Sequence, residues 1–211
     1  MSVKLTFFQL YYYKCYNDLY KIWFDNIMLD KKSIRKQILS RRRIISEHDS
    51  QIMGALLLNN LLPILEGKKH IAIYHACNGE ISLKSTIKYL LDLGVNVYQP
   101  IAINESRILR FEQIFSSNDS PIFVSQDYKI ANEIECYNLD LVIMPLVAAD
   151  KSGNRIGQGG GYYDSTFAKE NTNVVFCGVG YDWQIFDQFM AEDHDVKLDY
   201  FISNVDLLRF N

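Results

Sequence analysis

The run of residues 155–164, Arg-Ile-Gly-Gln-Gly-Gly-Gly-Tyr-Tyr-Asp, has side chains and spacing that suit phosphate binding. Glycines allow backbone conformations closed to other residues, so several N–H groups can converge on one anion. Arg155 can hold an anion, and Asp164 can hold a cation such as Mg²⁺. We interpret the run as a nucleotide-binding loop; the alternative is a tight connection whose glycines serve only the turn.

The order of residues in this run excludes two familiar phosphate-binding loops. No Gly-Lys-Ser/Thr follows it, so it is not a Walker A loop. Position 162 is Tyr where a Rossmann fingerprint needs Gly or Ala. A different kind of phosphate loop remains.

Several segments, in their order along the chain, are similar to those of one known family. They are Lys-Lys-Ser-Ile-Arg-Lys at 31–36 with three arginines at 41–43, Ile-Ala-Ile-Tyr at 71–74 with Asn-Gly-Glu-Ile at 78–81, Val-Tyr-Gln-Pro at 97–100, and Asp-Leu-Val-Ile-Met-Pro at 140–145. The core Gly-Gly-Gly-Tyr-Tyr-Asp, after Asn-Arg-Ile-Gly at 154–157, is highly specific. From residue 31 to the C-terminus the chain resembles the 5-formyltetrahydrofolate cyclo-ligases, also called methenyltetrahydrofolate synthetases.

The resemblance implies ATP- and Mg²⁺-dependent ring closure of 5-formyltetrahydrofolate to 5,10-methenyltetrahydrofolate, with release of ADP and phosphate. In that family the formyl oxygen attacks the γ-phosphate, N10 then attacks the activated carbon, and phosphate leaves. Phosphoryl transfer depends mostly on positioning and charge neutralisation. The residue types it needs are cations, backbone donors and a metal-binding acid, all of which the chain has.

The resemblance also assigns residues to each part of the site. The residues implied to bind the nucleotide are Lys31, Arg35, Arg155, Ile156, Gly157, Gln158, Gly159, Gly160, Gly161, Tyr162 and Tyr163. The residues implied to bind the folate, whose tail can be polyglutamated, are His75, Glu80, Gln158, Gly159, Gly160, Gly161 and Tyr162. The residues implied to be catalytic are Arg155, Gly159 and Asp164, and those implied to bind the metal are Asp164 and Asp199.

Bland alternatives remain open for several of these residues. Glu80 can equally be an exposed acid in a turn, and Tyr162 can be an aromatic anchor in the core. Asp199 can equally be part of an acidic surface loop. Gln158 and Ser165 stand where members of the family carry arginine, and either change weakens phosphate binding. The alternative function is therefore a catalytically inactive paralogue that binds folate or nucleotide on the same fold.

The segment after Asp30 predicts an amphipathic helix with Asp30 as its cap. Its apolar face consists of Ile34, Ile38 and Ile45. Cations at the edge of that face point toward the body of the protein, where a phosphate tail could be held: Lys31, Arg35 and Arg42. The cations that project elsewhere are Lys32, Lys36 and Arg43. Ordinary surface cations are the alternative to ligand binding.

Alternation of helices and strands predicts an α/β fold, a three-layer α/β/α domain with a mainly parallel central sheet. Strands are expected at 71–74, 95–98, 139–144 and 174–179, and a hairpin near 106–115. Helices are expected at 49–62, ending before Pro63, and at 82–93, 163–169 and 183–189. Ligands in such sheets bind beyond the carboxyl ends of the strands, where 78–80 and the glycine loop would lie.

Composition and charge describe one soluble domain. The 211 residues are 48% hydrophobic, and the net charge of −3 gives no bulk drive toward nucleic acid or membrane. A nucleic-acid binder using residues 31–43 is disfavoured, because the basic run is short. Four widely spaced cysteines, without zinc-ligand spacing, indicate reduced thiols in a cytoplasmic protein, and we expect a monomer.

Residues 1–27 are crowded with aromatic side chains and have no clear period. We expect them to be an atypical N-terminal extension, from a misplaced start codon, before a single catalytic domain at 28–211. The alternative is a genuine aromatic arm that packs on the domain or on a partner.

Overall fold

A nine-stranded, mainly parallel sheet forms the centre of the fold. The computed structural model describes residues 30–103, 106–116, 123–124, 130–167, 173–189, 192 and 195–210, and these contain the sheet order β12-β11-β9-β6-β1-β2-β3-β5, with β4 beside β2. Neighbours from β11 to β2 run parallel, whereas β12, β3 and β5 are antiparallel to the strands they pair with. The strands are β1 (His70–Ile73), β2 (Asn96–Ile103), β3 (Leu109–Ile114), β4 (Phe123–Val124), β5 (Glu133–Ile134), β6 (Leu141–Pro145), β9 (Val175–Val179), β11 (Tyr200–Ile202) and β12 (Leu207–Arg209).

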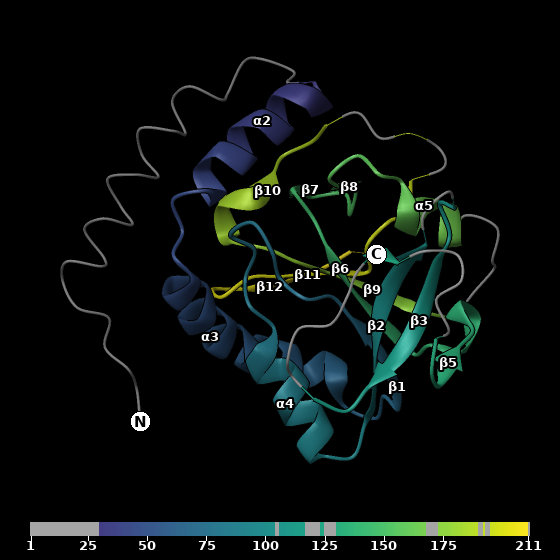
Figure 1. The fold of residues 1–211 in the computed structure, drawn as a ribbon. Coiled ribbons are helices and arrows are strands. Elements are labelled where there is room, and N and C mark those ends of the chain that lie inside the picture. Colours follow the sequence, from purple (N-terminus) through teal and green to yellow (C-terminus); the bar gives the residue numbers. More distant parts are fainter. Residues whose placement is uncertain are drawn as a thin grey trace.

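Helices cover both faces of the sheet, as Figure 1 shows for α3 (Glu47–Leu65) and α4 (Lys84–Asp92) on one side and α5 (Tyr162–Phe167) across from them. Successive strand residues point to opposite faces, so Ile71 and Ile73 join the core under α3 and α4, whereas Ala72 joins the core on the α5 side. The predicted α/β fold class, with its mainly parallel sheet, is therefore confirmed.

Helix α2 (Lys31–Arg42) lies over a second, three-stranded sheet in the order β10-β7-β8 (Figure 1). That sheet consists of β7 (Ala148–Asp150), β8 (Arg155–Ile156) and β10 (Ile185–Phe186). Asp30 caps the helix as predicted, since its Oδ1 accepts from the N–H groups of Lys32 at 2.8 Å and Ser33 at 3.0 Å. Ile34 and Ile38 are buried against the small sheet, so the predicted apolar face is the packed one.

Two of the predicted helices were wrong in extent or type. Helix α3 continues past Pro63 to Leu65, because a proline in the last turn loses only one hydrogen bond and the buried Leu61 and Ile64 hold that turn on the core. Residues 183–189 are not a helix but the short 3-10 turn η2 (Asp182–Gln184) followed by β10. There the backbone of β10 pairs with β7 instead of forming helical hydrogen bonds, and the Gln184 side chain donates to the Val147 carbonyl at 2.6 Å.

The second predicted strand is longer than expected, because β2 runs through Pro100 to Ile103. Parallel pairing of β1 with β2 ends at Tyr98, so the missing N–H of Pro100 leaves no bond to β1 unmade. The expectation of a hairpin near 106–115 was wrong, because these residues form the single strand β3, which pairs antiparallel with β2. Another 3-10 turn, η1 (Cys136–Asn138), precedes β6.

No helix in the described part of the chain is long and apolar enough to cross a membrane. The predicted extension at 1–27 lies outside the described residues, and the division at residue 28 stays a prediction.

Candidate active site

A cleft of about 530 Å³ opens where the neighbouring strands β1 and β6 end. From β1 the chain continues to β2 on one side, and from β6 it continues to β9 on the other. Loops that leave two such strands diverge and leave a crevice at the carboxyl edge of the sheet. The segment after β1 and the glycine loop after β8 both line this cleft, as the sequence predicts.

The glycine loop forms one wall, and every residue from 157 to 164 lines the cleft. Gly159 has φ of 105° and Gly161 has φ of 67°, a region that favours glycine over every other residue. Glycine is therefore needed at both positions for the loop to take this path. Ile156 does not reach the cleft and is buried beneath α2.

Arg155 and Asp164 form an ion pair across the base of this loop. The Arg155 Nη2 lies 2.7 Å from Asp164 Oδ1, and the arginine side chain is only 5% exposed. The same Oδ1 accepts from the N–H of Val196 at 3.1 Å, which brings the segment around residue 195 beside Asp164. The Arg155 guanidinium also lies 5.7 Å from the centre of the Tyr163 ring, whose own pKa is raised by burial. The charge of Arg155 is thus fixed in place next to the loop amides.

Lys31 and Arg35 line the facing wall from helix α2. Arg35 Nε donates to the Gly157 carbonyl at 2.8 Å, which ties the helix to the start of the glycine loop. Lys31 Nζ lies 2.8 Å from Asp195 and 3.1 Å from Glu192. Burial opposes the charged lysine, but the hydrogen bonds to these two acids outweigh it and raise the pKa of Lys31 above its usual value.

Arg42, the third cation of the predicted edge set, does not face the cleft as a ligand group. Its side chain is 0% exposed, and its Nη2 lies 2.9 Å from Glu80 Oε1. It also donates to the carbonyls of Cys77, Asn78 and Leu146. Because its donors are spent on these partners, Arg42 is a structural clamp.

Glu80 is buried at the meeting point of the two walls, so the exposed-turn interpretation was wrong. Its Oε2 accepts from the N–H of Cys77 at 3.1 Å, while its Oε1 accepts from Gln158 Nε2 at 3.0 Å. The Gln158 bond joins the predicted folate-side carboxylate directly to the predicted nucleotide loop. His75 and Tyr162 also line the cleft.

Asp199 is not brought to the cleft, contrary to the predicted metal pair. It lies before the amino end of β11, where its Oδ2 accepts from the N–H of Phe176 at 2.7 Å. Asp195, four residues earlier, lines the cleft together with Asp164. The parallel direction of β11 explains the error, since the start of this strand lies at the opposite edge of the sheet from the site.

Sequence reasoning missed several residues that line the cleft: Tyr74, Cys77, Pro100, Ala102, Arg107, Leu109, Pro145, Glu192 and Asp195. Burial raises the pKa of Tyr74 well above its usual value, and its hydroxyl has no hydrogen-bond partner among the described residues. Its place at the end of the apolar run 71–74 was a usable signal. Arg107 had none, because the predicted hairpin did not say which strand it would join.

The donor set fits one magnesium ion bound together with phosphate. Mg²⁺ is usually held by one or two carboxylates, with phosphate oxygens and water completing its octahedron. Asp164 and Asp195 are two such carboxylates, and both line the cleft together with the glycine loop. Among the described residues there is no group of three or more His, Cys, Asp or Glu side chains of the kind that holds a metal without a phosphate.

The arrangement of strands and helices is that of known methenyltetrahydrofolate synthetases. The 5,10-methenyltetrahydrofolate synthetase of Mycoplasma pneumoniae superposes with a TM-score of 0.68 at 24% identity, covering 83% of this chain and 99% of that one. The corresponding structure from Aquifex aeolicus gives a TM-score of 0.70 at 23% identity, over 86% and 93% of the two chains.

Sequence comparison gives the family. Residues 27–204 match the model of the 5-formyltetrahydrofolate cyclo-ligase family. The 5-formyltetrahydrofolate cyclo-ligase of Haemophilus influenzae is 30% identical over 178 residues, covering 80% of this chain and 94% of that one, and the enzyme of that name from Mycoplasma pneumoniae is 27% identical. The chain belongs to the 5-formyltetrahydrofolate cyclo-ligase family of enzymes.

Proposed function

We propose that this chain closes 5-formyltetrahydrofolate to 5,10-methenyltetrahydrofolate with ATP and Mg²⁺, releasing ADP and phosphate. The hydrogen bond of 3.0 Å between Gln158 and Glu80 carries the proposal. It joins a phosphate-type loop to a buried carboxylate within one cleft, so two substrates can meet there. A ligase that couples two reactants needs this kind of shared site.

The reaction balances without a nucleophilic side chain. The formyl oxygen forms a bond to the γ-phosphorus of ATP, and the bond from that phosphorus to the bridging oxygen of ADP breaks. N10 then attacks the activated carbon and loses its proton, and the formyl oxygen departs within the released phosphate. The protein contributes positioning and charge neutralisation, which dominate phosphoryl transfer.

The cations of the cleft divide between two walls. Lys31 and Arg35 bind the polyphosphate from α2, while Arg155 and the amides of 157–161 surround the transferred group. Arg155 is suited to this role because it is buried and its orientation is held by Asp164 at 2.7 Å. A cation held in place before the reaction costs no reorganisation when charge develops.

Glu80 binds the pterin by accepting hydrogen bonds from its amino and ring N–H groups. Arg42 and the Cys77 N–H hold the carboxylate in one orientation, so its geometry is set before folate arrives. His75 and Tyr162 lie on the same cleft and contact the folate. Gln158 stands where arginine occurs in some members, and its bond to Glu80 gives it a role that an amide can perform.

Asp164 and Asp195 would hold Mg²⁺, which would supply charge neutralisation for the transferred phosphoryl group. Asp195 also pairs with Lys31, so the metal site and the α2 cations are neighbours. The expectations of a cytoplasmic monomer without membrane or nucleic-acid partners stay predictions.

The test is methenyltetrahydrofolate formation, followed by its near-ultraviolet absorbance, with (6S)-5-formyltetrahydrofolate and Mg²⁺. Product that forms only when ATP is present supports the proposal. Folded protein that binds ATP or folate without forming product contradicts it and favours the inactive paralogue, with Gln158 and Ser165 as the first positions to restore to arginine.

A further inference from the structure

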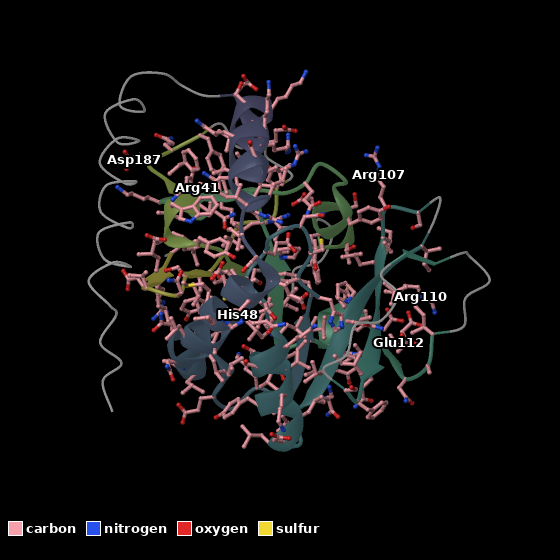
Figure 2. The ribbon with its side chains drawn as sticks, turned by 60° about the vertical axis from the view of Figure 1, so that its left-hand side comes forward. Arg41, His48, Arg107, Arg110, Glu112 and Asp187 are labelled. Carbon is pink, nitrogen blue, oxygen red and sulfur yellow. The ribbon has the colours of Figure 1, made fainter. Side chains whose placement is uncertain are left out.

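Arg107 lines the cleft but belongs neither to the glycine loop nor to α2. It precedes β3 and lines the cleft with an exposed side chain. It has no ion-pair partner within the part of the chain that the structure describes. Figure 2 shows it at the start of β3, apart from Arg110 and Glu112, which lie further along the strand. The cleft therefore has a cation that the phosphate chemistry does not use.

The backbone that carries Arg107 is held on both sides. The N–H of Ile108 donates to Ser106 Oγ at 3.0 Å, and the N–H of Ser106 donates to the Ile103 carbonyl at 3.2 Å. The N–H of Leu109 donates to Thr166 Oγ1 at 2.8 Å, and Thr166 belongs to α5, which follows the glycine loop. The position of Arg107 is thus tied, through Thr166, to the helix that follows the glycine loop.

Arg107 and Glu80 reach the cleft from segments next to two strands that are not neighbours. Glu80 follows β1, Arg107 precedes β3, and β2 lies between them. The cleft that contains both charges is also lined by the apolar residues Pro100, Ala102 and Leu109.

This sequence of surfaces matches the parts of one folate molecule. A folate has a pterin that donates N–H groups, an apolar benzoyl ring, and a glutamate with two carboxylates, joined in that order. We propose that Arg107 binds the carboxylates of the glutamyl tail and so determines the preference for a charged tail. The inference rests on the proposed function, because it places the pterin at Glu80.

The alternative cations for the tail are committed elsewhere. Lys31 is paired with Asp195 and Glu192, and Arg35 is bonded to the Gly157 carbonyl on the phosphate side. Arg107 is an arginine, whose planar fork suits two-point contact with a carboxylate. An exposed pair of this kind contributes modestly to affinity, so the effect is one of substrate preference and not of turnover.

The test compares Arg107→Ala with Arg110→Ala as a matched control, since Arg110 is also a β3 arginine but is paired with Glu133 and does not line the cleft. KM is measured for 5-formyltetrahydrofolate and for 5-formyltetrahydropteroate, which lacks the glutamate, at saturating ATP and Mg²⁺. With the folate, Arg107→Ala should raise KM about threefold to tenfold. With the pteroate, the KM of Arg107→Ala should be about equal to that of the unchanged protein, a ratio of about one.

Three outcomes overturn the inference: an equal effect of Arg107→Ala on both substrates, a change in KM for ATP instead, or the same result for the Arg110→Ala control. Titration calorimetry of 5-formyltetrahydrofolate without ATP separates this test from that of the proposed function. A protein without turnover whose folate Kd still rises threefold to tenfold in Arg107→Ala supports the tail site while contradicting the cyclo-ligase activity. Absence of folate binding overturns both.

Discussion

The two ends of helix α2 carry arginines near the same face, and the structure uses them in opposite ways. Arg42, in the last turn, is fully buried, pairs with Glu80 and donates to three backbone carbonyls. Arg35, about two turns earlier, is partly exposed, donates to one carbonyl and lines the cleft. The number of fixed partners, and not the residue type or the helix face, separates the structural cation from the ligand-binding one.

The position of the Arg42 clamp explains why it is buried. Two of its carbonyl partners, Cys77 and Asn78, follow β1, and the third, Leu146, follows β6. These are the two strands whose loops diverge to open the cleft. Arg42 therefore joins the loops on the two sides of the site from a buried position, whereas Arg35 lies on the cleft itself.

Arg42→Met should give the largest effect on stability. It leaves Glu80 buried without its counter-charge, and loss of one partner of a buried pair costs about 3–5 kcal/mol. Urea unfolding followed by circular dichroism measures the free energy of unfolding. The double variant Arg42→Met/Glu80→Gln should recover part of the loss, and a single variant that costs under about 1 kcal/mol would contradict the clamp.

Arg35→Ala should leave the fold intact and weaken the use of ATP. Loss of a charge-assisted bond to phosphate costs about 1.5–3 kcal/mol, which lowers kcat/KM for ATP by roughly 10- to 100-fold. The matched control is Lys36→Ala, because Lys36 is an exposed neighbour on the same helix that does not line the cleft. Equal kinetics for the two variants would show that α2 contributes no phosphate ligand.

Asp164→Asn sharpens the comparison on the opposite wall. Asparagine keeps an oxygen for the bond to Arg155 but removes the charge, so the Mg²⁺ concentration for half-maximal activity should rise about tenfold, or about 1.4 kcal/mol. Asp199→Asn is the control, since Asp199 lies away from the cleft and should leave Mg²⁺ dependence unchanged. A larger effect at 199 than at 164 would restore the metal pair expected from the sequence.

Lys31→Met should have the smallest effect on stability, under about 1 kcal/mol, because one of its acid partners is well exposed. The pKa of Lys31 is raised in the folded chain, so the ion pairs stabilise the fold below the usual value of 10.5 and are lost as pH rises through the raised value. The difference in unfolding free energy between the two proteins should therefore shrink as pH rises from below 10.5 through the raised value. A difference that stays constant over this range would mean that the lysine stabilises by packing alone.

Much of the fold follows from local patterns. The cap at Asp30, the buried strand β1 and the glycine loop were all predictable, since each depends on residues close together in the chain. The end of α3 and the segment 183–189 were predicted wrongly because tertiary contacts overrode local preference. Pro63 lies in a helical turn that packs on the core, and the Gln184 side chain bonds to the Val147 carbonyl.

The sequence by itself determined the family, the α/β class and the phosphate-type loop, because these reside in short runs whose backbone needs can be read residue by residue. Only the tertiary structure decided that Arg42 is a clamp, that Asp195 and not Asp199 reaches the cleft, and that Arg107 lines the same cleft. Each of these depends on contacts between segments far apart in the chain, such as the Lys31–Asp195 pair separated by 164 residues. The direction and order of strands in the sheet set such contacts, and no local spacing records them.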